Sequence, residues 1–117
     1  MSLERWQEIL REVTGVPGVR GALIVSADDG LVVAESAMEN VATSDVAALA
    51  AALVVRARQT AQAAQGAQPR SVHLTATGGV LLAMAGPDPL WLVALADPHA
   101  ELGRLRVLLG DFAVLLA

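Results

Sequence analysis

The sequence contains no cysteine, no lysine and no tyrosine, and its only aromatic residues are Trp6, Trp91 and Phe112. Without cysteine the chain has neither a disulfide framework nor thiol chemistry. Nucleic-acid binding needs a basic surface, usually with stacking rings, whereas this chain has a net charge of −4 and a pI near 4.9. We therefore expect no nucleic-acid partner. All eight basic residues are arginine, a composition that fits a GC-rich bacterial genome.

Residues suited to catalysis are equally scarce. The two histidines are His73 and His99. Ser71 and His73 share one side of a predicted strand, but no glycine-rich elbow or oxyanion-forming turn surrounds Ser71. Two isolated histidines without a cluster of carboxylates do not supply the three or four ligands of a metal site. The sequence therefore predicts a protein that is not an enzyme and has no cofactor and no metal.

Two short motifs have a functional and a structural interpretation. Asp28-Asp29-Gly30 is acidic, but it lacks the alternating oxygen ligands of a calcium loop and is typical of a hairpin turn. Gly78-Gly79 follows one predicted strand and leads into another, not into a helix N-terminus, so it lacks the geometry of a phosphate cradle. We interpret both motifs as turns.

The hydrophobic content is high for so short a chain. Of the 117 residues, 55% are hydrophobic and the mean hydropathy is +0.54. The longest apolar run in the predicted central helix, Val46–Val55, is far shorter than the roughly 20 residues that span a bilayer. The start of the chain lacks the features of a signal peptide. We expect one domain over residues 1–117, located in the cytoplasm, whose excess apolar surface is covered by a partner.

Residues 43–65 are predicted to form the central helix of the fold, because alanine dominates their interior. Ser44 or Asp45 can cap the start of this helix, and Gly66 with Pro69 can end it.

The apolar residues of this helix form two stripes, which indicates a helix covered on two sides. The larger stripe is expected to face a sheet of the same domain and consists of Val46, Leu49 and Leu53. The smaller stripe lets another helix approach closely and consists of Ala48, Ala51, Ala52 and Val55. A helix of the same chain could cover the smaller stripe, but we favour a second copy of the protein.

Five segments are predicted to be strands: 19–26, 31–36, 71–77, 80–85 and 90–96. Asp29-Gly30 indicates a hairpin between the first two, and the short connections make the sheet antiparallel. Segment 71–77 alternates, with Ser71, His73 and Thr75 on its polar side, and is expected at a sheet edge or a subunit boundary. The other four are nearly continuous apolar runs, typical of strands covered on both faces.

Amphipathic helices are predicted at both ends of the chain. Residues 2–14 form the first, and Asp97-Pro98 is expected to start the last. The last helix has an apolar face made of Leu102, Leu105, Leu109, Phe112 and Leu116. The predicted fold is a three-layer α+β domain (α/β/α) with a five-stranded antiparallel sheet and the order α-β-β-α-β-β-β-α.

The sequence resembles the Roadblock (dynein light chain-type) domain family, which includes bacterial MglB-like proteins. The resemblance lies in residues 16–25 (VPGVRGALIV), residues 29–34 (DGLVVA), the alanine-rich helix, residues 79–82 and residues 90–95. It covers essentially the whole chain. It implies a profilin- or longin-like sheet with the central helix on one face and the terminal helices on the other.

The resemblance also implies a mode of pairing, in which the central helix and the following strand join two copies. Together with the second apolar stripe, it suggests a dimer interface made of Ala48, Ala51, Ala52, Val55, Ser71, His73 and Thr75. Members of the family bind and regulate Ras-like small GTPases or act as platforms in larger assemblies. We therefore expect a homodimeric regulator or scaffold of a Ras-like small GTPase, with partner contacts at Arg56, Arg58, Gln59 and Gln62.

Two other functions remain open. One is a structural dimerisation or assembly module in a larger complex, with no effect on nucleotide hydrolysis. The other is a small-molecule sensor, which would need a defined apolar cavity with a few inward polar groups.

Overall fold

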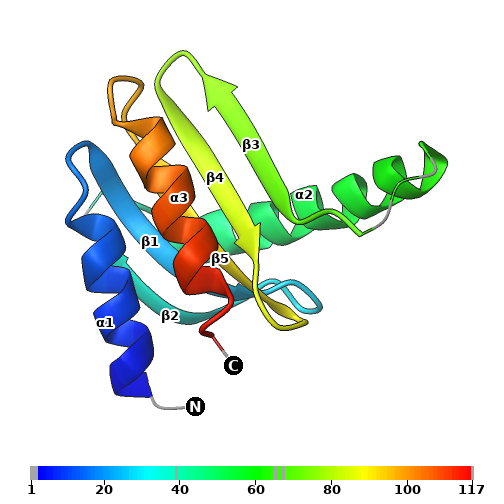
Figure 1. Cartoon of the computed structure of the whole chain (residues 1–117), viewed down its shortest axis with the longest axis horizontal. Coiled ribbons are helices and arrows are strands. Elements are labelled where there is room, and N and C mark those ends of the chain that lie inside the picture. Colours follow the sequence, from blue (N-terminus) through cyan, green and yellow to red (C-terminus); the bar gives the residue numbers. More distant parts are fainter. Residues whose placement is uncertain (1–2, 39, 65, 67, 117) are drawn as a thin grey trace.

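The fold is one antiparallel sheet held between helices, seen here in a computed structural model that describes residues 3–38, 40–64, 66 and 68–116 (Figure 1). The helices are α1 (Leu3–Thr14), α2 (Thr43–Ala63) and α3 (Leu102–Ala113). The strands are β1 (Val19–Ser26), β2 (Leu31–Ala37), β3 (Ser71–Ala76), β4 (Gly79–Ala85) and β5 (Leu90–Ala96). The predicted order of elements is confirmed. No helix in the described part of the chain is long and apolar enough to cross a bilayer.

The sheet has the strand order β2-β1-β5-β4-β3, and every neighbouring pair is antiparallel. The predicted hairpin between β1 and β2 is present, with Gly30 at φ 70°. Helix α2 then carries the chain to the opposite edge of the sheet, and β4 and β5 lead back to its centre, where β5 pairs with β1 through contacts such as Leu23 with Val93. This topology leaves β2 and β3 as the two edge strands.

Helices cover both faces of the sheet, as predicted. On one face α1 and α3 lie side by side over a core that includes Leu10, Ile24, Leu92 and Leu109. A hydrogen bond from Trp6 Nε1 to the Leu116 carbonyl, 3.1 Å long, joins the two ends of the chain on this face.

The second face of the sheet carries α2 alone among the described helices (Figure 1). Its buried residues are Ala47, Ala50, Ala51 and Val54. These small side chains let the helix backbone sit close to the bulky residues of the sheet beneath it, including Leu23, Trp91 and Val93. The helix thus packs through volume complementarity, with small residues above and large residues below.

This packing overturns the predicted orientation of α2. The larger stripe was expected on the sheet, yet Leu49 is 66% exposed, and Val46 and Leu53 are only half-buried. Ala51, predicted to face a second copy, is 8% exposed and packs near Gly30 of the β1–β2 turn. The prediction was wrong because large apolar residues were assigned to the sheet, whereas the sheet already supplies the volume and leaves room only for alanine.

Three smaller expectations also fail. Strand β2 is less covered than expected: Ala34 is its one buried residue, and Leu31 is 61% exposed. Helix α3 begins at Leu102, not at Asp97-Pro98: the Asp97 carbonyl instead accepts the Ala100 amide, and the Asp97 amide donates to the Gly18 carbonyl. Neither Ser44 nor Asp45 caps α2 as expected. The helix begins at Thr43, and its N-cap residue is Ala42, whose side chain cannot accept a hydrogen bond. The predicted end of α2, Gln65, lies outside the described residues.

Candidate interaction surface

The exposed side of α2 carries three of the four α2 residues predicted for a dimer interface. Ala48 and Ala52 are exposed, and Val55 is 43% exposed. Leu49 lies between them and is the most exposed large apolar residue of the helix. Leu49 and Leu53 follow Val46 at helical spacing, so these three residues line the flank of α2. This flank is covered only in part within the described residues, because Val46 packs against the core beneath α2 whereas Leu49 is exposed.

Strand β3 extends this surface at the edge of the sheet. It pairs with β4 along one side, from Ser71 opposite Met84 to Ala76 opposite Gly79, and no described strand pairs with its other side. Ser71, His73 and Thr75, the predicted interface residues of this strand, are all exposed. The Thr75 hydroxyl lies 3.0 Å from His73 Nε2. Leu74, on the opposite side of the strand, is 48% exposed, so β3 presents both an unpaired backbone and an apolar side chain.

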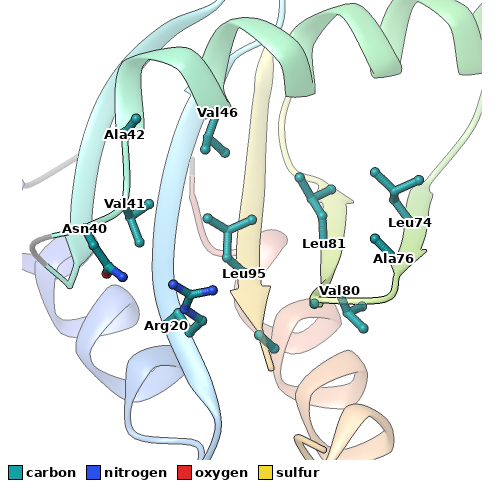
Figure 2. Close-up of a pocket in the computed structure, with 12 residues that line it drawn as sticks. Arg20, Asn40, Val41, Ala42, Val46, Leu74, Ala76, Val80, Leu81 and Leu95 are labelled. Carbon is teal, nitrogen blue, oxygen red and sulfur yellow. The ribbon is translucent and has the colours of Figure 1, made fainter. Parts of the chain in front are cut away.

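A hollow of about 370 Å³ lies between the start of α2 and the sheet. Figure 2 shows Val46 pointing from α2 towards Leu81 and Leu95, with Leu74 on the neighbouring strand. The lining comes from β1, β3, β4, β5 and the segment before α2: Arg20, Asn40, Val41, Ala42, Val46, Leu74, Ala76, Gly79, Val80, Leu81, Leu95 and Ala96. It is predominantly apolar, and its one charged side chain is Arg20, whose Nε lies 3.9 Å from Asp97 Oδ1.

The far half of α2 projects past the edge of the sheet beyond β3 (Figure 1). The residues predicted to meet a partner lie here. Arg56, Gln59 and Gln62 are exposed, and Arg56 Nη1 donates to Gln59 Oε1 at 3.2 Å. Arg58 differs, because its side chain is 30% exposed and its Nη2 lies 3.5 Å from Asp88 Oδ1 in the β4–β5 turn. Arg58 is thus directed at its own chain, whereas the other three remain open to solvent.

Sequence reasoning missed the leucines of this surface. Leu49 was assigned to the sheet, and Leu74, Leu81 and Leu95 were read only as strand residues. The signal that could have found Leu49 is the run of alanines on the opposite side of the helix, which fits closely on a sheet and leaves the leucine outside.

Within residues 3–38, 40–64, 66 and 68–116, no three histidine or carboxylate side chains come together in a way that could hold a metal ion. The Ser71 hydroxyl has no hydrogen bond to His73, which instead approaches Thr75.

Comparisons with known proteins agree with this arrangement. The sequence matches the Roadblock/LC7 domain model over residues 6–96. No curated protein sequence matches the chain. The solved structures with the same fold include three that have low sequence identity to this chain. MglB of Myxococcus xanthus is 15% identical with a TM-score of 0.87, covering 97% of this chain and 92% of that one.

A Roadblock/LC7 domain from Streptomyces avermitilis is 21% identical with a TM-score of 0.82, covering 91% of this chain and 89% of that one. An MglB described as having a tetrameric arrangement is 21% identical with a TM-score of 0.83, covering 94% and 88%. Since the family model spans most of the sequence and the sheet and helices follow the same plan, the chain belongs to the Roadblock/LC7 domain family.

Proposed function

We propose that the protein is a non-enzymatic homodimer that regulates or scaffolds a Ras-like small GTPase in the bacterial cytoplasm. The observation that carries the proposal is the continuous apolar surface made by the flank of α2, the free edge of β3 and the hollow between them. A surface of this kind on a small protein marks an interaction site.

A two-fold axis beside β3 accounts for all three parts of the surface at once. The two β3 strands would pair antiparallel and complete their backbone hydrogen bonds, which removes an exposed sheet edge. The overhang of each α2 would then lie across the sheet of the other copy. Since α2 crosses only one end of β3 in its own chain, the overhang of the second copy would cover the end that carries the hollow.

Burial of the exposed leucines supplies the driving force for this pairing. Leu49 and Leu74 are 66% and 48% exposed. Complete burial of a leucine side chain is worth roughly 1.5–3 kcal/mol, so these partly exposed residues contribute somewhat less from each copy. Ala48 and Ala52 keep the exposed face of α2 narrow, so two α2 helices can approach at the short end of the roughly 8–10 Å range of helix packing.

The dimer is tested by replacing one exposed leucine on each side of the molecule. Leu49→Glu should remove the α2 contact and lower the mass measured by light scattering at the same protein concentration, because it places a charge in the α2 pair. Leu31→Glu is the matched control, since Leu31 is 61% exposed but lies on the opposite sheet edge. A wild-type chain with the mass of a monomer at micromolar concentration, or equal masses for the two variants, would contradict the proposed interface.

Regulation of a GTPase rests on membership of the family and on the exposed polar end of α2. Arg56, Gln59 and Gln62 are available to a partner, and an arginine supplied in trans can stabilise the charge on a transferring phosphate. Arg56 is otherwise a solvated helix residue.

The partner is tested by capture of the small GTPases of the source organism, each loaded with GTP or GDP. We expect binding that depends on the nucleotide. Arg56→Ala should lower any stimulation of GTP hydrolysis, whereas Arg11→Ala on α1 should not. Binding without any change in hydrolysis supports the alternative of a structural assembly module, and no nucleotide-dependent binding to any of these GTPases contradicts the regulatory role.

A further inference from the structure

The outer face of α3 carries two glycines that the fold itself does not require. Gly103 and Gly110 lie within the helix, neither has a positive φ, and no heavy atom outside the helix backbone lies within 4 Å of the point where a Cβ would stand. Glycine inside a helix costs roughly 1 kcal/mol relative to alanine. Since no other described residue fills the space above them, these glycines destabilise the isolated fold without a local benefit.

Two exposed valines stand on the same face. Val107 and Val114 are 65% and 61% exposed. Val114 follows the last turn in a helical conformation, with φ −67° and ψ −15°, so the face continues through it. The four residues alternate as Gly103, Val107, Gly110 and Val114, which is the spacing of the a and d positions of a heptad repeat.

The sequence of α3 repeats with the same period. Residues 103–109 read GRLRVLL and residues 110–116 read GDFAVLL. Glycine, valine and two leucines recur at equivalent positions. Most of the leucines serve the core: Leu105, Leu109 and Leu116 are buried and Leu108 is half-buried, whereas Leu115 is 39% exposed. The glycines and valines face outward, and a heptad pattern on the outward side of a helix is the pattern of a helix–helix seam.

We infer that this outer face of α3, defined by Gly103, Val107, Gly110 and Val114, is a second self-association surface that pairs antiparallel with α3 of another copy. In an antiparallel pair, a positions face d positions. Val107 then faces Gly110 of the second copy, and Val114 faces its Gly103. Each valine side chain fills the space above a glycine, which two isolated helices would leave empty.

The charges on the flank of the seam favour the same partner and the same direction. Arg104 and Asp111 are exposed and occupy the same heptad position, one residue past each glycine. In an antiparallel pair, residues at this heptad position face residues at the same position of the other helix. Arg104 of each copy therefore faces Asp111 of the other, which gives two such contacts. Within its own chain, Arg104 Nη1 lies 3.6 Å from Glu101 Oε2. Both side chains are exposed, so this ion pair is weak and leaves the arginine free to reorient.

This contact is separate from the one proposed for α2 and β3. Helix α3 lies on the opposite face of the sheet (Figure 1), so both contacts can exist in one assembly. A helix of 12 residues is only about 18 Å long, so the α3 pair is expected to be weak and to depend on concentration.

The first experiment measures mass by light scattering across a dilution series, in wild type and in the Leu49→Glu variant that removes the α2 contact. We expect concentration-dependent association in both. Val107→Glu with Val114→Glu should abolish it, and Leu31→Glu should not. Wild-type and Leu49→Glu chains whose masses do not change with concentration would overturn the inference, whatever the outcome for the α2 contact.

Charge reversal tests the direction of the pair without altering the apolar seam. Arg104→Asp should weaken association, and adding Asp111→Arg to the same chain should restore it. A double variant as weak as the single one would overturn the assigned pairing.

Cross-linking gives an independent test, because the chain has no cysteine of its own. Gly103→Cys mixed with a mass-tagged Val114→Cys should form a disulfide between the two variants. Val114→Cys should not form one with itself, since an antiparallel pair holds these residues roughly 16 Å apart along the axis, beyond the about 7 Å that a disulfide spans. Self-cross-linking of Val114→Cys in place of the mixed product would overturn the antiparallel arrangement.

Discussion

The orientation of α2 predicts that glutamate substitutions at two adjacent alanines, Ala51 and Ala52, have different effects on the stability of the fold. Ala51 is 8% exposed and faces the body of the domain, where its Cβ lies 3.6 Å from the point at which a Cβ on Gly30 would stand. Ala52 is exposed on the other side of the helix. Helical periodicity alone assigned both residues to one interface, so the pair distinguishes the observed packing from the pattern.

At Ala51 a glutamate would add four heavy atoms and a charge to a packed position. Overpacking alone costs about 1–3 kcal/mol, and a buried charge without a partner adds to that. Because Ala51 lies near a surface turn, the carboxylate can reach water in part, and we expect a loss of about 3 kcal/mol. For a domain of this size such a loss lowers the melting temperature by about 12 °C.

At Ala52 the same change adds its charge to a solvent-facing position. The stability of the isolated chain should change by less than about 0.5 kcal/mol, as for an ordinary surface substitution. If the proposed α2 pair forms, Ala52→Glu should nevertheless lower the mass seen by light scattering, because the charge then lies between two helices.

Urea unfolding followed by circular dichroism measures both effects. Each variant is compared with Leu49→Glu, in which the proposed α2 contact is removed, at two protein concentrations, because association raises apparent stability by mass action. The reasoning fails if Ala51→Glu unfolds at the same urea concentration as Ala52→Glu, or if Ala52→Glu is the less stable variant at both protein concentrations.

Two further predictions concern the packing of the α1–α3 face. Gly18→Ala should destabilise the fold by about 2 kcal/mol or more, because Gly18 has φ 89° and an added Cβ would lie 2.8 Å from the Cβ of Ala100. Gly78→Ala is the control, with open space and no positive φ, and similar melting temperatures for the two variants would contradict the expectation. Trp6→Phe should cost about 1 kcal/mol in urea unfolding, because it removes the hydrogen bond to the Leu116 carbonyl. An unchanged midpoint would show that this bond adds nothing to stability.

Much of the fold was predictable because its signals are local. Asp29-Gly30 marked the first hairpin, whose loop spans residues 27–30 between the paired Ser26 and Leu31, and Gly30 adopts the positive φ that glycine tolerates. The alternation of polar Ser71, His73 and Thr75 with apolar residues indicated that β3 is an edge strand, because a strand with one solvent-exposed side tolerates polar residues at every second position. The continuous apolar runs of β4 and β5 indicated central strands, and both strands lie inside the sheet.

The failures came where two elements compete for the same space. Leu31 reads like a core residue, but the topology leaves β2 with one neighbour. Asp97-Pro98 reads like a helix start, but the Asp97 amide and carbonyl are taken by Gly18 and Ala100. Each signal is valid locally, and the tertiary hydrogen bonds or the strand order outweigh it.

The sequence by itself determined that α2 is a helix with two apolar sides, because the spacing of its residues is a local property. Only the tertiary structure decided which side faces the sheet. That choice depends on the volume already filled by Leu23, Trp91 and Val93 beneath the helix, which leaves room for alanine and turns Leu49 outward. Residues distant in sequence supply that volume, so no pattern within α2 could reveal it.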